Sequence, residues 1–339
     1  MNKNFLTLGI ETSCDDTGVA VLKGEREILA ELLSSQIKDH ANFGGVVPEF
    51  AVRKHLENIL PLINAALSKA NINFKDLNLI AVTRGPGLMG SHMVGVMTTR
   101  ALAQAWGVNI VGVNHLEGHM FAPLVDLSAD ELRPPFLSLI VSGGHTQIIL
   151  VKEFGDYKLL GETRDDAAGE AYDKAARVLG LPYPGGPEID RLAAKGDAKA
   201  FDFPVPLKNT REIEFSFSGL KTALLWRVKK LQAENIELDE KILCDLCASF
   251  QASVIAALIA KVKLAVKLTG IKNIAVSGGV AANSALRDAL INLRGVKAYL
   301  PKFSRCTDNA VMIAMAGKNN FDRGVKSDLN LAPDPALNI

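Results

Sequence analysis

Short apolar runs alternate along this chain with longer stretches in which apolar residues recur every three or four positions. Residues 6–22, LTLGIETSCDDTGVAVL, predict a strand, a polar turn and a second strand; residues 137–151, LSLIVSGGHTQIILV, follow the same plan with a shorter turn. Helical spacing predicts helices over 47–70, 91–106, 167–179, 239–268 and 308–321. Strands that alternate with helices in this way indicate an α/β fold.

The plan of the first half returns in the second. In each half the hairpin is followed by an apolar IAV strand, a glycine-rich turn and a helix: IAVTRGPGLMG begins at residue 80 and IAVSGGVAAN at residue 274. We therefore predict a duplicated α/β domain with halves 1–133 and 134–339. Proline and glycine interrupt the pattern around 181–221, which predicts an insertion in the second half.

Size and charge narrow the possible functions. The chain has 339 residues, 48% of them hydrophobic, which suits two folded domains of roughly 100–200 residues each. Lys and Arg number 38 against 37 Asp and Glu, so the formal net charge is +1. The chain therefore lacks the overall positive charge that favours binding to nucleic acid. Any RNA contact must come from a local patch or from a partner.

The apolar stretch 252–268 contains three lysines, so we expect a buried amphipathic helix there and no membrane span. Residues 1–10 lack the apolar core of a secretory signal, and we expect the protein to remain in the cytoplasm. Four cysteines in so long a chain do not make a disulfide framework. Cys244 and Cys247 form a CxxC pair without a second pair, and we expect core packing there rather than zinc.

Glycine-rich turns after strands present backbone N–H groups to phosphate oxygens. This chain has four such turns, at residues 85–87, 142–144, 185–187 and 277–279. One alone has an ordinary steric explanation, but four, two of them at matching places in the repeat, favour a nucleotide held in a cleft between the halves. Neither GxxxxGK[ST] nor GxGxxG is present, so the sequence supports neither a P-loop nor a dinucleotide fold.

His115 and His119 are four residues apart and share one face if their segment is helical, which is a spacing typical of metal ligands. In a zinc protease of the HExxH type the glutamate follows the first histidine directly. Here Glu117 stands two residues on, roughly on the opposite helix face, so a metallopeptidase would lack its base.

Several carboxylates complete the candidate chemistry. Asp308 is the best third metal ligand, although a helix N-cap is an equally good interpretation; two imidazoles and a carboxylate suit ferrous iron or another divalent ion. Asp15 and Asp16 lie at the tip of the first hairpin, where polar residues need no function. Asp173 and Asp190 are candidates for hydrogen bonds to ribose or base.

Eight motifs, in order along nearly the whole chain, closely resemble the bacterial TsaD family, the tRNA adenosine threonylcarbamoyltransferases. They are GIETSCDDT from Gly9, NHLEGH from Asn114, SGGHT from Ser142, DDAAGEAYDK from Asp165, YPGGP from Tyr183, FSFSGLKT from Phe215, SGGVAAN from Ser277 and CTDNAVMIA from Cys306.

The resemblance implies the fold of actin, sugar kinases and heat-shock ATPases, with two ribonuclease-H-like halves around a cleft. It implies transfer of the threonylcarbamoyl group from threonylcarbamoyl-AMP to the N6 amine of the adenosine 3′ of the anticodon, in tRNAs that read codons beginning with A. AMP is the leaving group.

The resemblance also assigns residues. The implied iron (Fe2+) ligands are His115, His119 and Asp308; the implied substrate contacts are Ile140, Val141, Ser142, Gly143, Gly144, Asp173, Gly186, Asp190 and Asn283. We add Asp15 as a candidate general base.

Partners follow from the same resemblance: a heterodimer with the paralogue TsaB, the ATPase TsaE, and TsaC as the source of the adenylate. We expect the TsaB interface on the helices over 47–70 and 91–106, because both carry apolar faces. The alternatives are a metallopeptidase, a non-catalytic ATP-binding switch of the same fold and a small-molecule kinase.

Overall fold

The computed structural model describes residues 4–128 and 130–339, which form two compact units. Residues up to 128 and residues 308–339 make the first unit, and residues 130–307 make the second. Each unit is built around a five-stranded sheet, and the described part of the chain is mixed α/β.

The sheet of the first unit has the order β3-β2-β1-β4-β5. The predicted hairpin is β1 with β2, antiparallel and continued by antiparallel β3, while β4 and β5 add in parallel on the other side of β1. The bounds are β1 Leu6–Glu11, β2 Thr17–Lys23, β3 Glu27–Ser34, β4 Leu79–Gly85 and β5 Asn109–Asn114.

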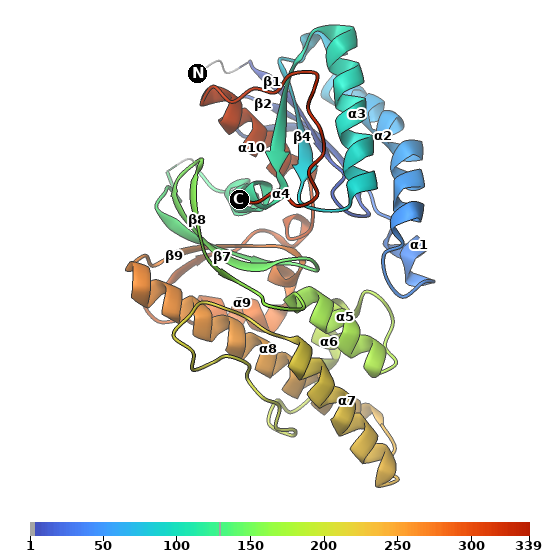
Figure 1. The fold of residues 1–339 in the computed structure, drawn as a ribbon, viewed down its shortest axis with the longest axis vertical. Helices are drawn as coiled ribbons and strands as arrows, with labels where there is room; N and C mark the ends of the chain where they lie inside the picture. The colour runs from blue at the N-terminus through green and yellow to red at the C-terminus, as the bar shows by residue number, and fades with distance from the viewer. Residues whose placement is uncertain (1–3, 129) are drawn as a thin grey trace. The chain divides into compact units, whose positions relative to one another are not determined.

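Helices cover both faces of this sheet (Figure 1). Leu8 and Ile10 face a core shared with Ile59 and Ile63 of α2, whereas Gly9 between them faces α10. An added Cβ at Gly9 would lie 2.3 Å from the Ala310 carbonyl oxygen, so α10 approaches the sheet as closely as glycine allows. The helices are α1 Ile37–Ala41, α2 Pro48–Ala70, α3 Met89–Trp106, α4 His115–Phe121 and α10 Ala310–Asp322, with short 3-10 turns at Phe74–Asp76 and Ala122–Leu124.

The second unit repeats the topology of the first, which confirms the predicted duplication. Its sheet order is β10-β9-β6-β7-β8. Strand β7 pairs antiparallel with both β6 and β8, while β9 pairs parallel with both β6 and β10. The strands are β6 Phe136–Val141, β7 Thr146–Glu153, β8 Asp156–Glu162, β9 Asn273–Ser277 and β10 Lys297–Tyr299.

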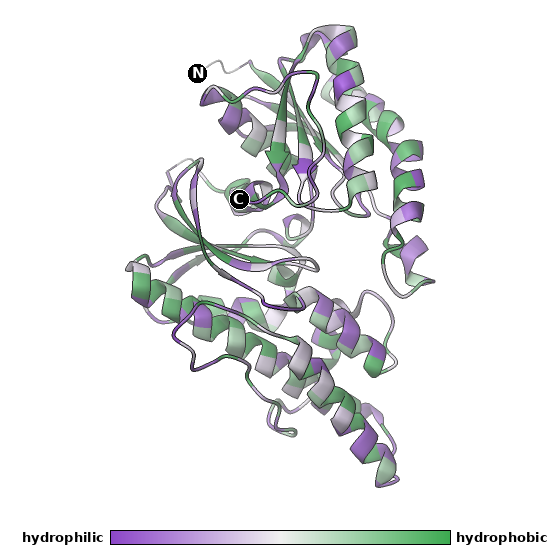
Figure 2. Cartoon of the chain, in the orientation of Figure 1, coloured by the Kyte–Doolittle hydropathy of each residue, from purple (hydrophilic) through white to green (hydrophobic). Residues whose placement is uncertain are grey.

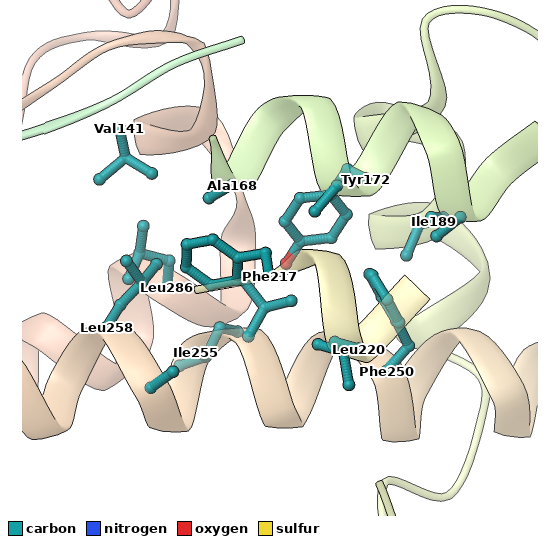
Figure 3. Packing of buried hydrophobic residues seen from close by; sticks show 14 of the residues in the cluster. Val141, Ala168, Tyr172, Ile189, Phe217, Leu220, Phe250, Ile255, Leu258 and Leu286 are labelled. Carbon is teal, nitrogen blue, oxygen red and sulfur yellow. The ribbon is translucent and has the colours of Figure 1, made fainter. Parts of the chain in front are cut away.

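The core of the second unit packs around α8 (Figure 3). Hydrophobic residues run along this helix, as Figure 2 shows, and 72% of its most apolar 18-residue stretch is buried. This helix is therefore apolar because it packs in the core of the second unit. Cys244 and Cys247 are buried in that core as predicted, and burial raises the pKa of Cys247 to about 12. The helices are α5 Ala168–Val178, α6 Gly185–Ala193, α7 Ser218–Ala233, α8 Glu240–Thr269 and α9 Ser284–Ile291; short 3-10 turns lie at Gly279–Ala282 and Phe303–Arg305.

Two predicted boundaries differ from the structure. The sequence division left residues 308–339 in the second half, but they belong to the first unit because α10 packs on β1, β2 and β4. The predicted insertion at 181–221 includes the whole of α6 and the start of α7, and residues 194–217 between them lack a regular helix or strand.

Candidate metal centre

Two elements bring the predicted metal ligands together. Strand β5 ends at Asn114, whose side chain caps α4 by accepting from Leu116 N at 2.8 Å. The helix therefore starts at His115, and the rings of His115 and His119 meet edge to face, with centroids 4.6 Å apart. At the other end of the chain, Asn309 caps α10 by accepting from Met312 N. The N-cap interpretation of Asp308 is therefore wrong.

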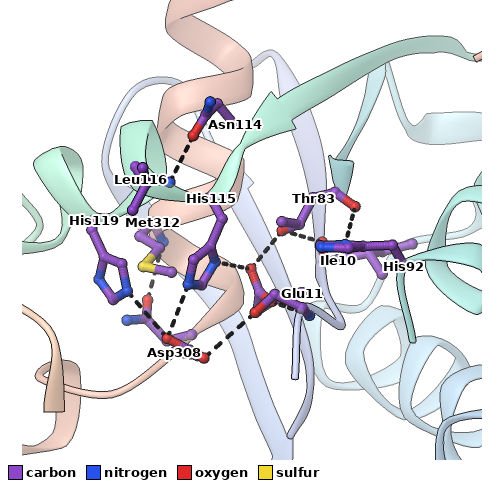
Figure 4. A network of polar contacts seen from close by, with 12 residues as sticks. Ile10, Glu11, Thr83, His92, Asn114, His115, Leu116, His119, Asp308 and Met312 are labelled. Carbon is purple, nitrogen blue, oxygen red and sulfur yellow. Dashed lines mark hydrogen bonds and ion pairs between the residues drawn. The ribbon is translucent and has the colours of Figure 1, made fainter. Parts of the chain in front are cut away.

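The Asp308 carboxylate faces both imidazoles (Figure 4). Its Oδ1 lies 3.5 Å from His115 Nε2 and 3.2 Å from His119 Nε2. One candidate ligand atom from each of the three residues lies within 4.8 Å of the others, and no other such group occurs among residues 4–128 and 130–339. The structure thus assembles the three residues that the sequence singled out.

His119 is fully buried and lacks ordinary hydrogen-bonding partners. Nε2 is near Asp308 without a well-directed hydrogen bond, and Nδ1 has no partner in the described residues. Burial lowers the pKa of His119, which keeps the ring neutral and its lone pair available. A buried polar nitrogen without a partner is unfavourable unless something binds it, so these three side chains fit a divalent ion.

His115 has a second carboxylate on its other side. Glu11 Oε2 lies 3.2 Å from His115 Nδ1, and Thr83 Oγ1 donates to the same oxygen. Burial by itself would lower the pKa of His115. The negative charges of Asp308 and Glu11 outweigh it and raise this pKa to about 9. In turn, His115 holds the pKa of Glu11 below its ordinary value despite burial. Sequence analysis missed Glu11; the available signal was an acid that ends an otherwise apolar strand.

Three further acids that the sequence analysis considered lie in the first unit. Glu117 is buried, and its Oε2 accepts from Asn320 Nδ2 at 2.8 Å. Asp15 and Asp16 lie in the turn between β1 and β2, as predicted. Burial raises the pKa of Asp16 to about 6.

In the second unit, the predicted contacts 140–144 surround the tip of the β6–β7 hairpin. Ile140 and Val141 end β6 and are buried. Residues 142–144 form the turn between β6 and β7, which confirms the strand–turn–strand plan predicted over 137–151. An added Cβ at Gly143 or Gly144 would meet nothing within 4 Å, so the tip is open.

Asp173 and Gly186 lie next to each other. Asp173 Oδ1 accepts from Gly185 N at 2.7 Å, and Gly186 N also donates to this carboxylate. Burial nevertheless raises the pKa of Asp173 above its ordinary value. This carboxylate closes the turn that opens α6.

Asp190 and Asn283 lie together in a polar network. Asp190 Oδ1 accepts from Gln251 Nε2 and Asn283 Nδ2, both at 3.1 Å, and from Ser284 Oγ, while Oδ2 accepts from Ser284 N. Asn283 also caps α9 by accepting from Leu286 N. Gln251, which sequence analysis did not select, is buried in the long helix α8 and gives no local signal.

Comparison with protein families and curated relatives gives a consistent result. A family model described as TsaD, tRNA N6-adenosine threonylcarbamoyltransferase, matches residues 27–315. A relative of that name from Thermodesulfovibrio yellowstonii is 51% identical over 329 residues, covering 96% of this chain and 98% of the relative. Another from Anaeromyxobacter is 49% identical over 336 residues, covering 98% of this chain and 99% of the relative.

Solved structures of distant sequence share the fold. HypF, solved in a phosphate- and nucleotide-bound form, aligns with a TM-score of 0.61 at 13% identity, over 95% of this chain and 47% of HypF. The activator of 2-hydroxyisocaproyl-CoA dehydratase from Clostridium difficile, solved with ADPNP, aligns with a TM-score of 0.54 at 15% identity, over 96% of this chain and 99% of the activator. With the duplicated topology, these likenesses show the actin-like ATPase fold.

Proposed function

Because this chain belongs to the TsaD family and is a tRNA N6-adenosine threonylcarbamoyltransferase, we propose that its donor is threonylcarbamoyl-AMP and its acceptor the adenosine 3′-adjacent to the anticodon. The acceptor tRNAs read codons beginning with A, and AMP leaves. The observation that carries the proposal is the cluster of His115, His119 and Asp308 within a chain of this family. A tRNA substrate also supports a cytoplasmic location.

Transfer to the adenosine N6 amine requires activation of the carbonyl of the threonylcarbamoyl group. The acceptor is an aromatic amine whose lone pair is delocalised into the ring, so it attacks poorly. His115, His119 and Asp308 would hold one divalent metal, which we propose to be Fe2+, because two imidazoles and one carboxylate leave coordination positions open. A bound ion of this kind supplies Lewis-acid polarisation of a carbonyl.

Other residues bind and orient. The open tip at 142–144 lets a ligand approach the backbone closely, which supports contact with the adenine nucleotide; proteins of this fold have been solved with nucleotides bound. Asp173, Gly186, Asp190 and Asn283 stay our candidates for further substrate contacts. Asp15 is our candidate base for the proton lost by the amine, and Asp15→Asn should lower kcat more than it raises KM.

The decisive experiment is a reconstitution with TsaB, TsaE, ATP, threonylcarbamoyl-AMP and unmodified tRNA, followed by nucleoside mass spectrometry. We expect a threonylcarbamoyladenosine peak that disappears with His119→Ala. Full activity of His119→Ala without bound metal would contradict the role of the metal. An absent peak with active partners would favour the ATP-binding switch.

The metallopeptidase alternative loses its base in the structure as well. Glu117 is the acid nearest in sequence to both histidines, yet its carboxylate is engaged by Asn320. The family assignment does not favour this alternative either.

For TsaB we propose a docking face on α2 and α3. Large apolar side chains are exposed at helical spacing on both: Leu56 and Leu60 on α2, and Met89, Met93 and Met97 on α3. Between 47% and 61% of each of these five side chains is exposed, which is unusual for a monomer surface and typical of a protein interface.

The exposed residues of the two helices form one face, because α2 and α3 pack closely: an added Cβ at Gly90 would lie 2.5 Å from Val52 Cγ2. Met93→Glu should abolish the heterodimer in size-exclusion chromatography, while Val325→Glu, exposed elsewhere on the same unit, should not. Unchanged heterodimer formation by Met93→Glu would reject this face. TsaE would bind the heterodimer, and TsaC would supply the adenylate.

A further inference from the structure

A fourth charged side chain stands behind the three predicted ligands. Glu11 is the last residue of β1 and is fully buried. Its Oε2 approaches Nδ1 of His115, which is the ring nitrogen opposite the one that faces Asp308. Figure 4 shows His115 between the two carboxylates.

The Glu11 carboxylate is itself held from two sides. Oε1 accepts from the backbone N–H of Ser13, and Oε2 accepts from Thr83 Oγ1 on the neighbouring strand β4. Thr83 is fully buried, so water does not compete for this contact. A buried carboxylate is unfavourable unless its oxygens are satisfied, and here all the partners fix one orientation.

A histidine can bind a metal through only the nitrogen that carries no proton. A carboxylate that accepts a hydrogen bond from Nδ1–H keeps the proton on that nitrogen, so that a metal ion binds the ring at Nε2, on the side of the ligand cluster. We propose that Glu11 is a positioning residue that fixes the tautomer and ring orientation of His115 for metal binding; this rests on the proposed metal centre.

The two histidines are therefore not equivalent. His119 Nδ1 has no comparable carboxylate among the described residues, so no partner at that nitrogen fixes the tautomer of its ring. His115 is the pre-oriented ligand of the pair, and the metal should lose affinity when Glu11 is removed. Loss of such an outer partner lowers metal affinity by roughly 10–100-fold.

The experiment measures metal binding directly, without catalysis. Metal-free full-length protein is titrated with Co2+, followed by its visible absorption and by competition with a chromophoric chelator. Glu11→Ala should bind Co2+ roughly 10–100-fold more weakly than the natural protein. Glu11→Gln, which keeps the shape and one acceptor oxygen, should fall between the two.

The matched control is Glu117→Gln, a second buried glutamate near the histidines, whose carboxylate accepts from Asn320 Nδ2. It should leave the Co2+ affinity unchanged. Equal affinities for Glu11→Ala and the natural protein would overturn the proposal, as would an equal loss in Glu117→Gln. If Glu11→Ala fails to fold, Thr83→Val, which removes only one donor to Glu11, should still weaken Co2+ binding.

A second measurement addresses the tautomer. In the Zn2+-loaded protein with 15N-labelled histidine, the nitrogen shifts should show His115 protonated at Nδ1 and metal-bound at Nε2. Glu11→Ala should lose this signature, and metal bound through Nδ1 in the natural protein would refute the assignment. If the natural protein binds neither Co2+ nor Zn2+, the metal centre of the proposed function fails as well; if it binds both and Glu11 has no effect, only the positioning role fails.

Discussion

Asp190 is the residue where a structural role and a substrate-binding role can be separated. The resemblance predicts a substrate contact, yet in the structure both carboxylate oxygens accept hydrogen bonds from Gln251, Asn283 and Ser284. Asp190→Ala removes every one of these acceptors. We expect its main effect to be a loss of stability in the second unit.

The magnitude follows from which donors water can reach. Ser284 is exposed, so water replaces its lost contacts, and Asn283 Nδ2 keeps the oxygen of Gln251 at 2.6 Å. Gln251 Nε2 is left without its carboxylate in a buried side chain. A buried donor left unsatisfied costs about 1–3 kcal/mol, so we expect a loss of about 2–3 kcal/mol for the network.

The assay is hydrogen exchange during mild denaturation, read in peptides from α6, α8 and α9, the three helices that the network joins. These peptides should exchange faster in Asp190→Ala and not in Glu237→Ala, which changes an exposed acid. Unchanged exchange together with a raised KM for threonylcarbamoyl-AMP would refute the structural interpretation and favour a substrate contact.

Three further predictions test single features of the packing. Tyr172→Phe removes a buried hydroxyl that lacks a partner among the described residues, so unfolding measurements should show stability unchanged or raised by about 1 kcal/mol; a loss would reveal a bound water. Burial raises the pKa of Asp16 from the ordinary 3.8 to about 6, so stability is lost as pH rises from about 3.8 to about 6 and does not change further above that. Asp16→Asn should therefore gain stability at about pH 8, by at most roughly 3 kcal/mol, and almost none at about pH 3; an equal gain at both would contradict the shift. Gly9→Ala should lower stability by about 1–3 kcal/mol through collision with α10, whereas Gly219→Ala, which meets no atom within 4 Å, should not; equal melting temperatures would contradict the close approach.

Local patterns predicted the elements and the repeat because each strand and helix carries its own apolar period. The same patterns could not assign the last helix to a sheet. Residues 308–321 have the helical spacing of any amphipathic helix, and their position on the first sheet depends on two close contacts at glycine, one on β1 and one within α10 itself. The start of α10 packs against Gly9, where there is no room for a side chain. Gly317 lets the helix approach Ala81 of β4, because a Cβ added at Gly317 would lie 2.3 Å from the Ala81 Cβ.

The site divides in the same way. His115 and His119 could be found because one helical turn sets their spacing, and Asp308 because its residue type completes the pair. Glu11 offers only the weak signal of an acid that ends an apolar strand, since its function depends on the pairing of β1 with β4 and of β4 with β5, which brings Thr83 and His115 to its carboxylate.

The location of the ligands within one unit has a consequence that can be tested. His115, His119, Asp308 and Glu11 all belong to the first unit, and α10 fixes Asp308 through its own cap and its contact with Gly9. Metal affinity should therefore change only with substitutions in the first unit. Gly9→Ala should weaken Co2+ binding, because α10 must shift and carry Asp308 with it. Asp190→Ala should leave Co2+ affinity unchanged under conditions where the protein stays folded, since its network lies wholly in the second unit. A metal affinity that falls in Asp190→Ala and holds in Gly9→Ala would mean that some other part of the chain positions the Asp308 carboxylate.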